Sequence, residues 1–143
     1  MRHVIFFLDR DRYALPLDAV REVVNAPESY SRVPHAKDAV KGVMTLRGRV
    51  VPVVDLGRLL ALGLQPPGKG KVVLLELVRR ELGLLVTEVE GIESIEKVGP
   101  QGRASRMVRG LARVGPLTVT VLDVEGLDAA VTASFSSEPE RNR

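Results

Sequence analysis

The residues that could hold a metal ion or a nucleotide are few in this sequence. Histidine occurs only at His3 and His35, and cysteine does not occur. Neither histidine has the spacing from a carboxylate that metal-binding helices use, and thiolate ligands are excluded. Lys69 stands between two glycines, but the segment lacks the pattern of a phosphate-binding loop. The residue types therefore predict no metal site and no bound cofactor.

The carboxylates and serines have simpler explanations than catalysis. Asp55 and Asp123 each follow an apolar run and precede a helical stretch, where an aspartate caps a helix N-terminus. The serines lack the strand-turn-helix context of a nucleophile elbow. One extended segment carries an acidic run, Glu88, Glu90, Glu93 and Glu96. This run is either a solvated face or a surface for a partner. Because no nucleophile, base and orienting group come together, we predict that the protein is not an enzyme and has no catalytic residue.

The most informative segment is an expected hairpin that holds two arginines. Two apolar runs rich in valine flank Arg47-Gly48-Arg49, and both are typical of buried strands. Gly48 can adopt the positive φ that a tight turn needs. The pattern predicts a hairpin over residues 42–55, with both arginines near its tip, where their charges stay in water.

A second segment repeats the order of these features. Residues 109–123 run through Arg-Gly, a turn, a proline, an apolar strand and an aspartate. Gly48 and Gly110 are 62 residues apart, whereas Asp55 and Asp123 are 68 apart. Two similar β units with loops of unequal length are the simplest interpretation, although so degenerate a pattern also arises by chance.

Periodicity and turn residues predict the other elements. Strands are expected at residues 3–8, 13–17, 20–24, 71–78 and 81–86, with extended chain at 87–98. Helices are expected at residues 56–64 and 124–131, and polar loops at 25–38 and 99–106. In the strand at 20–24, Glu22 shares a face with two valines, which indicates an edge or the rim of a groove. The segment at 65–70, rich in proline and glycine, is the best boundary between two halves.

Composition narrows the class of protein. The 143 residues are 45% hydrophobic but only 3% aromatic, which predicts one domain, or two small subdomains, with an aliphatic core in β structure. The absence of cysteine fits a cytoplasmic protein. No apolar run approaches the roughly 20 residues of a membrane span, and the N-terminal residues suit a first strand better than a signal peptide. The net charge of +3 is spread along the chain and does not by itself imply a nucleic-acid partner.

Motifs along nearly the whole chain resemble the CheW-like chemotaxis adaptor family. They occur in the order of that family, as Phe6-Phe7-Leu8, Tyr13-Ala14-Leu15-Pro16-Leu17, Val20-Arg21-Glu22-Val23-Val24, Val33-Pro34, residues 40–48, residues 50–56 and Gly83-Leu84-Leu85-Val86. The most specific is the pattern Gly-x-x-x-Leu-Arg-Gly-x-x-x-Pro-x-x-Asp-Leu, which begins at Gly42. Two positions depart from the family: Thr45 stands where it usually has Asn, and Thr87 where it usually has Asp.

The resemblance implies a mainly β fold. Two small SH3-like barrels of five strands each would pack together, with short helices and a groove between them. Residues 1–132 would form a CheW-like domain of two intertwined barrel subdomains, and residues 133–143 a flexible C-terminal tail.

The resemblance also implies a function. The protein would be a non-catalytic signalling adaptor in chemotaxis or pilus motility. It would couple the cytoplasmic tip of a methyl-accepting chemoreceptor to the regulatory domain of a CheA-type histidine kinase. It would act in the cytoplasm, without inserting into the membrane and without binding nucleic acid. By resemblance, a receptor groove would be lined by Leu17, Val20, Glu22, Val86 and Val89, with Arg47 pairing with Glu22 at its rim.

One alternative function has some support from the sequence. A small β-barrel that binds nucleic acid would fit the pI of 9.6 and the arginines beside Gly48 and Gly110. The shortage of aromatic side chains argues against it, because single-stranded nucleic acids are bound largely by stacking on such rings.

Overall fold

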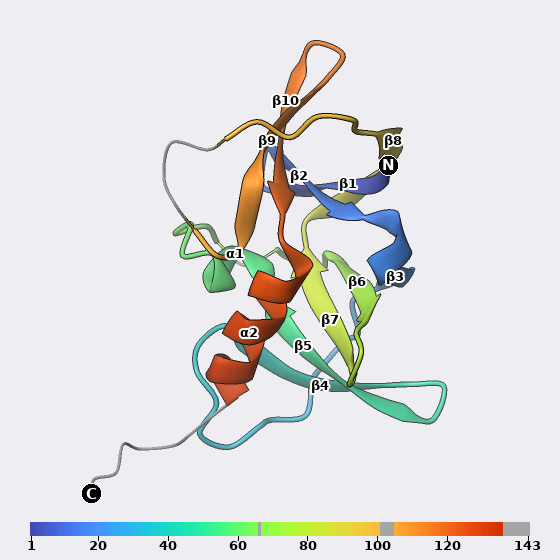
Figure 1. Cartoon of the computed structure of the whole chain (residues 1–143). Helices are drawn as coiled ribbons and strands as arrows, with labels where there is room; N and C mark the ends of the chain where they lie inside the picture. The colour runs from blue at the N-terminus through green and yellow to red at the C-terminus, as the bar shows by residue number, and fades with distance from the viewer. Residues whose placement is uncertain (66, 101–104, 136–143) are drawn as a thin grey trace, which may run out of the picture.

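Two five-stranded β-sheets form the computed structural model (Figure 1), which describes residues 1–65, 67–100 and 105–135. The sheet that we call the first barrel contains β1 (Arg2–Leu8), β2 (Asp11–Pro16), β8 (Glu88–Ser94), β9 (Val108–Val114) and β10 (Leu117–Leu122). The second barrel contains β3 (Val20–Asn25), β4 (Val40–Leu46), β5 (Arg49–Asp55), β6 (Lys71–Glu76) and β7 (Glu81–Val86). The predicted mainly β fold of two five-stranded units is confirmed.

The order of the strands intertwines the two halves of the sequence. Neighbouring strands follow β8-β1-β2-β10-β9 in the first barrel and β3-β6-β7-β5-β4 in the second. Each barrel therefore contains strands from both halves. The halves are joined by parallel contacts of β2 with β10 and of β5 with β7, and by antiparallel contacts of β1 with β8 and of β3 with β6. The predicted boundary at residues 65–70 lies between the two sequence halves, and it does not divide the barrels because each barrel draws strands from both halves.

The internal repeat is confirmed, with a corrected alignment. Gly42 and Gly110 are each the third residue of the first strand of equivalent hairpins, and they are 68 positions apart, the same spacing as the two aspartates. At both glycines a backbone carbonyl lies where a side chain would be: a Cβ would stand 2.3 Å from the oxygen of Ser31 and 1.9 Å from that of Gly99. The equivalent of Gly110 is therefore Gly42 and not Gly48, and no difference in loop length is needed.

Three short helical segments connect or close the barrels. They are the 3-10 turn η1 (Leu17–Ala19), α1 (Leu56–Leu59) and α2 (Val124–Phe135). Asp55 and Asp123 cap the two α-helices as predicted, each accepting a hydrogen bond of 3.3 Å from the backbone N–H three residues later. In each half, a strand is thus followed by an aspartate that caps the next helix through the same hydrogen bond.

The lengths of the helices differ from the prediction. The chain leaves helical geometry after Leu59, and Ala61 and Gly63 have positive φ values of 58° and 70°, so the expected helix at 56–64 is a single turn. The second helix extends to Phe135, beyond the expected 124–131, and its Ser134 carbonyl accepts a hydrogen bond from the Lys37 N–H. Residue 66 of the predicted boundary, residues 101–104 of the predicted loop and residues 136–143 of the predicted tail lie outside the described residues.

A shared core holds the barrels against each other. Its central cluster includes Phe6 and Leu15 of the first barrel, Leu75 and Leu84 of the second, and Leu127 of α2, all fully buried. Each barrel also has a smaller cluster of its own. Valine and leucine predominate, as the composition predicts. Close packing of this kind transmits displacement, so the central cluster fixes the edge strands of both barrels relative to each other.

Candidate partner-binding surface

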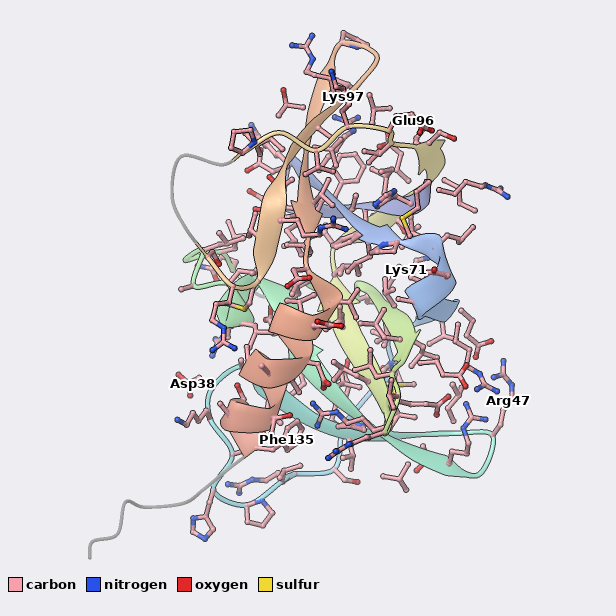
Figure 2. All side chains as sticks on the ribbon, viewed as in Figure 1. Asp38, Arg47, Lys71, Glu96, Lys97 and Phe135 are labelled. Carbon is pink, nitrogen blue, oxygen red and sulfur yellow. The ribbon has the colours of Figure 1, made fainter. Side chains whose placement is uncertain are left out.

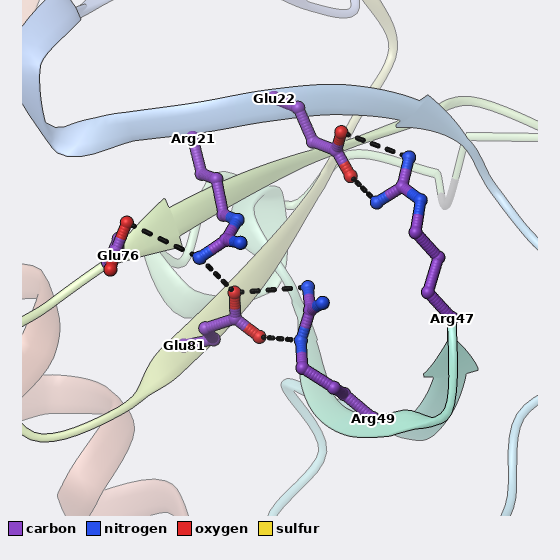
Figure 3. Close-up of polar contacts among 6 residues, drawn as sticks. All are labelled: Arg21, Glu22, Arg47, Arg49, Glu76 and Glu81. Atoms are coloured by element: carbon purple, nitrogen blue, oxygen red, sulfur yellow. Dashed lines mark hydrogen bonds and ion pairs between the residues drawn. The ribbon is translucent and has the colours of Figure 1, made fainter.

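The predicted ion pair between Arg47 and Glu22 is present. Arg47 stands at the outer end of the β4–β5 hairpin (Figure 2) and Glu22 on β3, at the other edge of the second barrel. The guanidinium donates two hydrogen bonds to the carboxylate, with lengths of 2.5 Å and 3.1 Å (Figure 3). The pair therefore links the edge strand β3 to the hairpin that contains the opposite edge strand, β4. Its contact is planar, has two hydrogen bonds and is accessible to solvent.

The backbone of the hairpin explains why Arg47 points outward. Arg47 and Gly48 have φ values of 50° and 80°, which give the tight turn that joins antiparallel strands. Gly48 predicts this turn from the sequence, whereas nothing in the sequence indicates the left-handed conformation of Arg47. The side chain of Arg47 is 59% exposed and that of Glu22 is 28% exposed, so the ion pair is accessible to solvent. We call Glu22 and Arg47 together the rim pair, or the rim.

A second group of charges lies beside this pair. Glu81 on β7 accepts two hydrogen bonds from Arg49 of β5, at 2.9 Å and 3.2 Å. Its Oε2 also lies 3.3 Å from a terminal nitrogen of Arg21, which is in turn 3.5 Å from Glu76 (Figure 3). Arg21 is the extra residue of a β-bulge in β3, since Val20 pairs with Leu75 and Glu22 with Leu74. Charges from four strands thus meet beside the rim.

These charges act on Glu22 together. The hydrogen bond from Arg47 lowers the pKa of Glu22 most, and the positive charges of Arg47, Arg21 and Arg49 lower it further. The pKa of Arg47 is raised in return, chiefly by its hydrogen bond to Glu22. Both partners consequently stay ionised at neutral pH, and the rim has a fixed pattern of charge.

The apolar residues expected in the groove do not share one environment. Leu17 in η1, Val20 on β3 and Val89 on β8 are half-buried, and the two valines pack against the central cluster. Val86 is fully buried within that cluster, so the expectation that it lines an accessible groove is wrong. The alternating environment of an edge strand exposes part of β3, whereas β7 is a central strand buried on both sides.

The first barrel has a related ion pair with the charges reversed. Arg12 of β2 donates hydrogen bonds of 2.8 Å and 3.0 Å to Glu90, the bulge residue of β8. Arg12 occupies the strand position that Glu81 has in the second barrel, and Glu90 the position of Arg21; each pair is 69 residues apart in the sequence. This spacing is the signal by which the sequence could indicate the network around Glu81.

The rim pair has no counterpart of its kind in the described part of the first barrel. The position after the bulge in β8 is Gly91, where β3 has Glu22, and the turn between β9 and β10 contains Gly115, where the other hairpin has Arg47. Glycine has no side chain with which to form an ion pair. The repeat therefore supplies the same backbone twice, and the sequence equips the second barrel with the charged rim.

The two departures from the family pattern differ in structural role. The hydroxyl of Thr87 accepts a 2.8 Å hydrogen bond from the N–H of Asp9, which has a φ of 58° in the β1–β2 turn. A threonine therefore supplies the acceptor that holds this turn. Thr45 lies on β4, where its side chain is exposed, and the effect of either departure on binding stays a prediction.

The described residues contain neither a cluster of metal ligands nor a membrane-spanning helix. Among them, no three His, Cys, Asp or Glu side chains are grouped so that they could hold a metal ion. None of the helices within residues 1–65, 67–100 and 105–135 is long and apolar enough to cross a membrane.

Comparison with known proteins identifies the relatives of this sequence and fold. Residues 2–131 match the family described as CheW-like domain. The chemotaxis protein CheW of Thermotoga maritima is 23% identical over 132 residues, which span 89% of this chain and 87% of the relative. CheW of Klebsiella aerogenes is 26% identical over 132 residues, 87% of this chain and 79% of the relative.

A pilus-named relative and a solved structure complete the comparison. Protein PilI of Pseudomonas aeruginosa is 37% identical over 82 residues, 57% of this chain and 46% of PilI. The crystal structure of the scaffolding protein TtCheW from Thermoanaerobacter tengcongensis superposes with a TM-score of 0.78 at 24% identity, covering 88% of this chain and 86% of that one. This likeness establishes that the two chains share their fold.

Proposed function

The chain belongs to the CheW-like domain family, and from this premise we propose that it is a non-catalytic scaffold of chemotaxis or motility signalling. It joins the cytoplasmic tip of a methyl-accepting chemoreceptor to the regulatory domain of a CheA-type histidine kinase, in the cytoplasm. The names of the relatives in T. maritima and K. aerogenes support the chemotaxis pathway. The partial match to PilI supports a pilus-motility pathway as the other setting.

The observation that carries this proposal is the accessible Glu22–Arg47 pair, with the half-buried Val20 on the same strand as Glu22. We define the docking surface as Leu17, Val20, Glu22, Arg47 and Val89, which omits the buried Val86. A helical hairpin such as a receptor tip binds through apolar side chains at helical spacing, and charges at the edge of the contact set its orientation. Val20 and Val89, at equivalent bulges of β3 and β8, supply the apolar part, and the Glu22–Arg47 pair supplies the charged edge.

A scaffold of this kind acts by position. Once the receptor is bound at the docking surface, a kinase bound elsewhere on the same protein meets the receptor at a high effective concentration. The central core fixes the barrels relative to each other, so the geometry between the two bound partners is defined. We place the kinase contact at the ends of the barrels, where a regulatory domain of like fold can dock barrel to barrel.

Reconstitution tests the proposal. The purified protein is mixed with a soluble receptor cytoplasmic fragment and the histidine kinase of the same organism, and complexes are separated by size. We expect a complex of all three that the receptor fragment and kinase do not form without this protein, and we expect the receptor fragment to change the rate of kinase autophosphorylation only in that complex. Absence of binding to both partners at physiological salt would refute the proposal.

A further inference from the structure

We propose that Glu81 is a positioning residue of the docking surface, which holds Arg21 and Arg49 away from Glu22 so that Glu22 binds Arg47 alone. The link from this arrangement to partner binding rests on the proposed function. The arrangement itself concerns only the side chains of Figure 3.

Competition for Glu22 is built into the second barrel. Three guanidinium groups, those of Arg21, Arg47 and Arg49, are close enough to Glu22 for their charges to act on its carboxylate. Only Arg47 forms hydrogen bonds with it among the contacts of Figure 3. Arginine side chains are long and reorient readily, so the choice among three similar donors depends on what holds the other two.

Glu81 holds the other two arginines. Both of its oxygens accept from Arg49, and Oε2 also faces Arg21 at 3.3 Å. The side chain of Glu81 is 18% exposed, less than the 28% of Glu22, so its contacts are better shielded from water than those of the rim. An ion pair strengthens as water is excluded, and Glu81 is therefore the preferred partner of Arg21 and Arg49. Arg47, which is 59% exposed, is left as the partner of Glu22.

The first barrel shows that the fold does not require this arrangement. Leu117 opens β10 and pairs with the last residue of β9, as Arg49 opens β5 and pairs with the last residue of β4. An apolar side chain thus takes the place of Arg49, and a single ion pair between Arg12 and Glu90 takes the place of the network around Glu81. The extra arginine and the acceptor that restrains it accompany the rim pair in the second barrel.

Replacement of the carboxylate is the first experiment. Glu81→Gln keeps the size of the side chain but removes the charge that Arg21 and Arg49 share. Arg49 then loses its partner and Arg21 keeps only its contact with Glu76, so both compete with Arg47 for Glu22. We expect the Nη–H resonances of Arg47, whose terminal nitrogens donate to Glu22, to move toward those of a solvated arginine in a proton–nitrogen NMR spectrum. We also expect the affinity for the receptor fragment to fall about tenfold. The matched control is Asp128→Asn on α2, which removes the negative charge that pairs with Arg80. We expect it to leave the Arg47 resonances and the receptor affinity unchanged.

Removal of the competitors is the decisive experiment. The triple variant combines Glu81→Gln and Arg21→Gln with Arg49→Leu, which introduces the residue type that Leu117 provides in the first barrel. Glu22 then again has one donor nearby. We expect the Arg47 resonance and the receptor affinity to return to within about twofold of the unmodified protein. A role of Glu81 in direct contact with the partner, or in packing alone, would leave the triple variant as weak as Glu81→Gln.

The outcomes separate this inference from the proposed function. An unchanged Arg47 resonance in Glu81→Gln, or a folded triple variant that stays weak, overturns the inference. If Glu81→Gln does not fold, the triple variant decides by the same criterion. If the unmodified protein does not bind the receptor fragment, the proposed function fails, whereas the Arg47 resonance in the variants still decides whether Glu81 positions the pair.

Discussion

Two separate variants, Val86→Ala and Val20→Glu, test which valine belongs to the core and which to the docking surface. Val86 is 0% exposed within the central cluster, whereas Val20 is half-buried on an edge strand. Val86→Ala removes two buried methyl groups and leaves a cavity, which costs about 2 kcal/mol of unfolding free energy. For a domain of this size, that loss lowers the melting temperature by about 7 °C.

For receptor binding we expect the opposite order of effects: Val86→Ala has none and Val20→Glu has a large one. Val86→Ala changes no accessible atom, so at 25 °C the folded protein binds the receptor fragment with unchanged affinity. Val20→Glu places a charge in the apolar part of the docking surface and abolishes detectable receptor binding, while it lowers the free energy of unfolding by about 1 kcal/mol. Thermal denaturation and a binding titration at about 25 °C measure the two quantities on the same samples.

A matched control and a clear refutation accompany this pair. Val78→Glu makes the same chemical change at a fully exposed valine in the β6–β7 turn and leaves both stability and binding intact. If Val20→Glu lowers the melting temperature as much as Val86→Ala does, Val20 belongs to the core. If Val86→Ala weakens binding without loss of folded protein, the exclusion of Val86 from the docking surface is wrong.

Three further predictions concern the rim and the repeat. Arg47→Ala should weaken ternary assembly about tenfold in a titration at physiological salt, with a melting temperature close to that of the unmodified protein; unchanged assembly would show that Arg47 is merely solvated. Gly42→Ala should cost about 3 kcal/mol in chemical denaturation, because its Cβ would lie 2.3 Å from a backbone oxygen, whereas Gly91→Ala, with open space around the new methyl group, should be nearly neutral. The pKa of Glu22 is lowered from 4.5, so its contribution to the rim is present above the unfolded-state pKa and is lost only as pH falls through the lower folded-state pKa. Receptor affinity should therefore be constant from about pH 7 to about pH 5 and decline only below 4.5, and Glu22→Gln should remove that acid-side decline.

The sequence predicts local features of this fold better than it predicts how they combine. The strands and the hairpin at Arg47-Gly48 follow from apolar runs and one turn residue, which act within a few positions of the chain. The exchange of strands between halves depends on long-range pairings that no short pattern encodes, namely β1 with β8, β2 with β10, β3 with β6 and β5 with β7. The expected helix at 56–64 has leucines at helical spacing, but the left-handed turn at Ala61 and Gly63 ends it early.

The candidate site is predictable only in part. The family resemblance indicates the Glu22–Arg47 pair across 25 positions of sequence, and the structure confirms it. Val86 belongs to an apolar run that is buried from Leu82 onward, and such a run carries no alternation from which one side could be assigned to a groove. The pairing of Arg49 with Glu81 joins residues from different halves, and the repeat does not indicate it, because Leu117 stands in the first barrel where Arg49 stands in the second.

The repeat also explains why the charged rim depends on the whole chain. Glu22, Arg47 and Arg49 come from the first half of the sequence, whereas Glu81 comes from the second. Because β7 pairs with β5 across the halves, Glu81 reaches Arg49 only when both halves have assembled. A partner that recognises Glu22 and Arg47 in their paired geometry therefore binds only the assembled fold. The two barrels share one backbone plan but differ at the positions of this pair, because the first barrel has Gly91 and Gly115 where the second has Glu22 and Arg47.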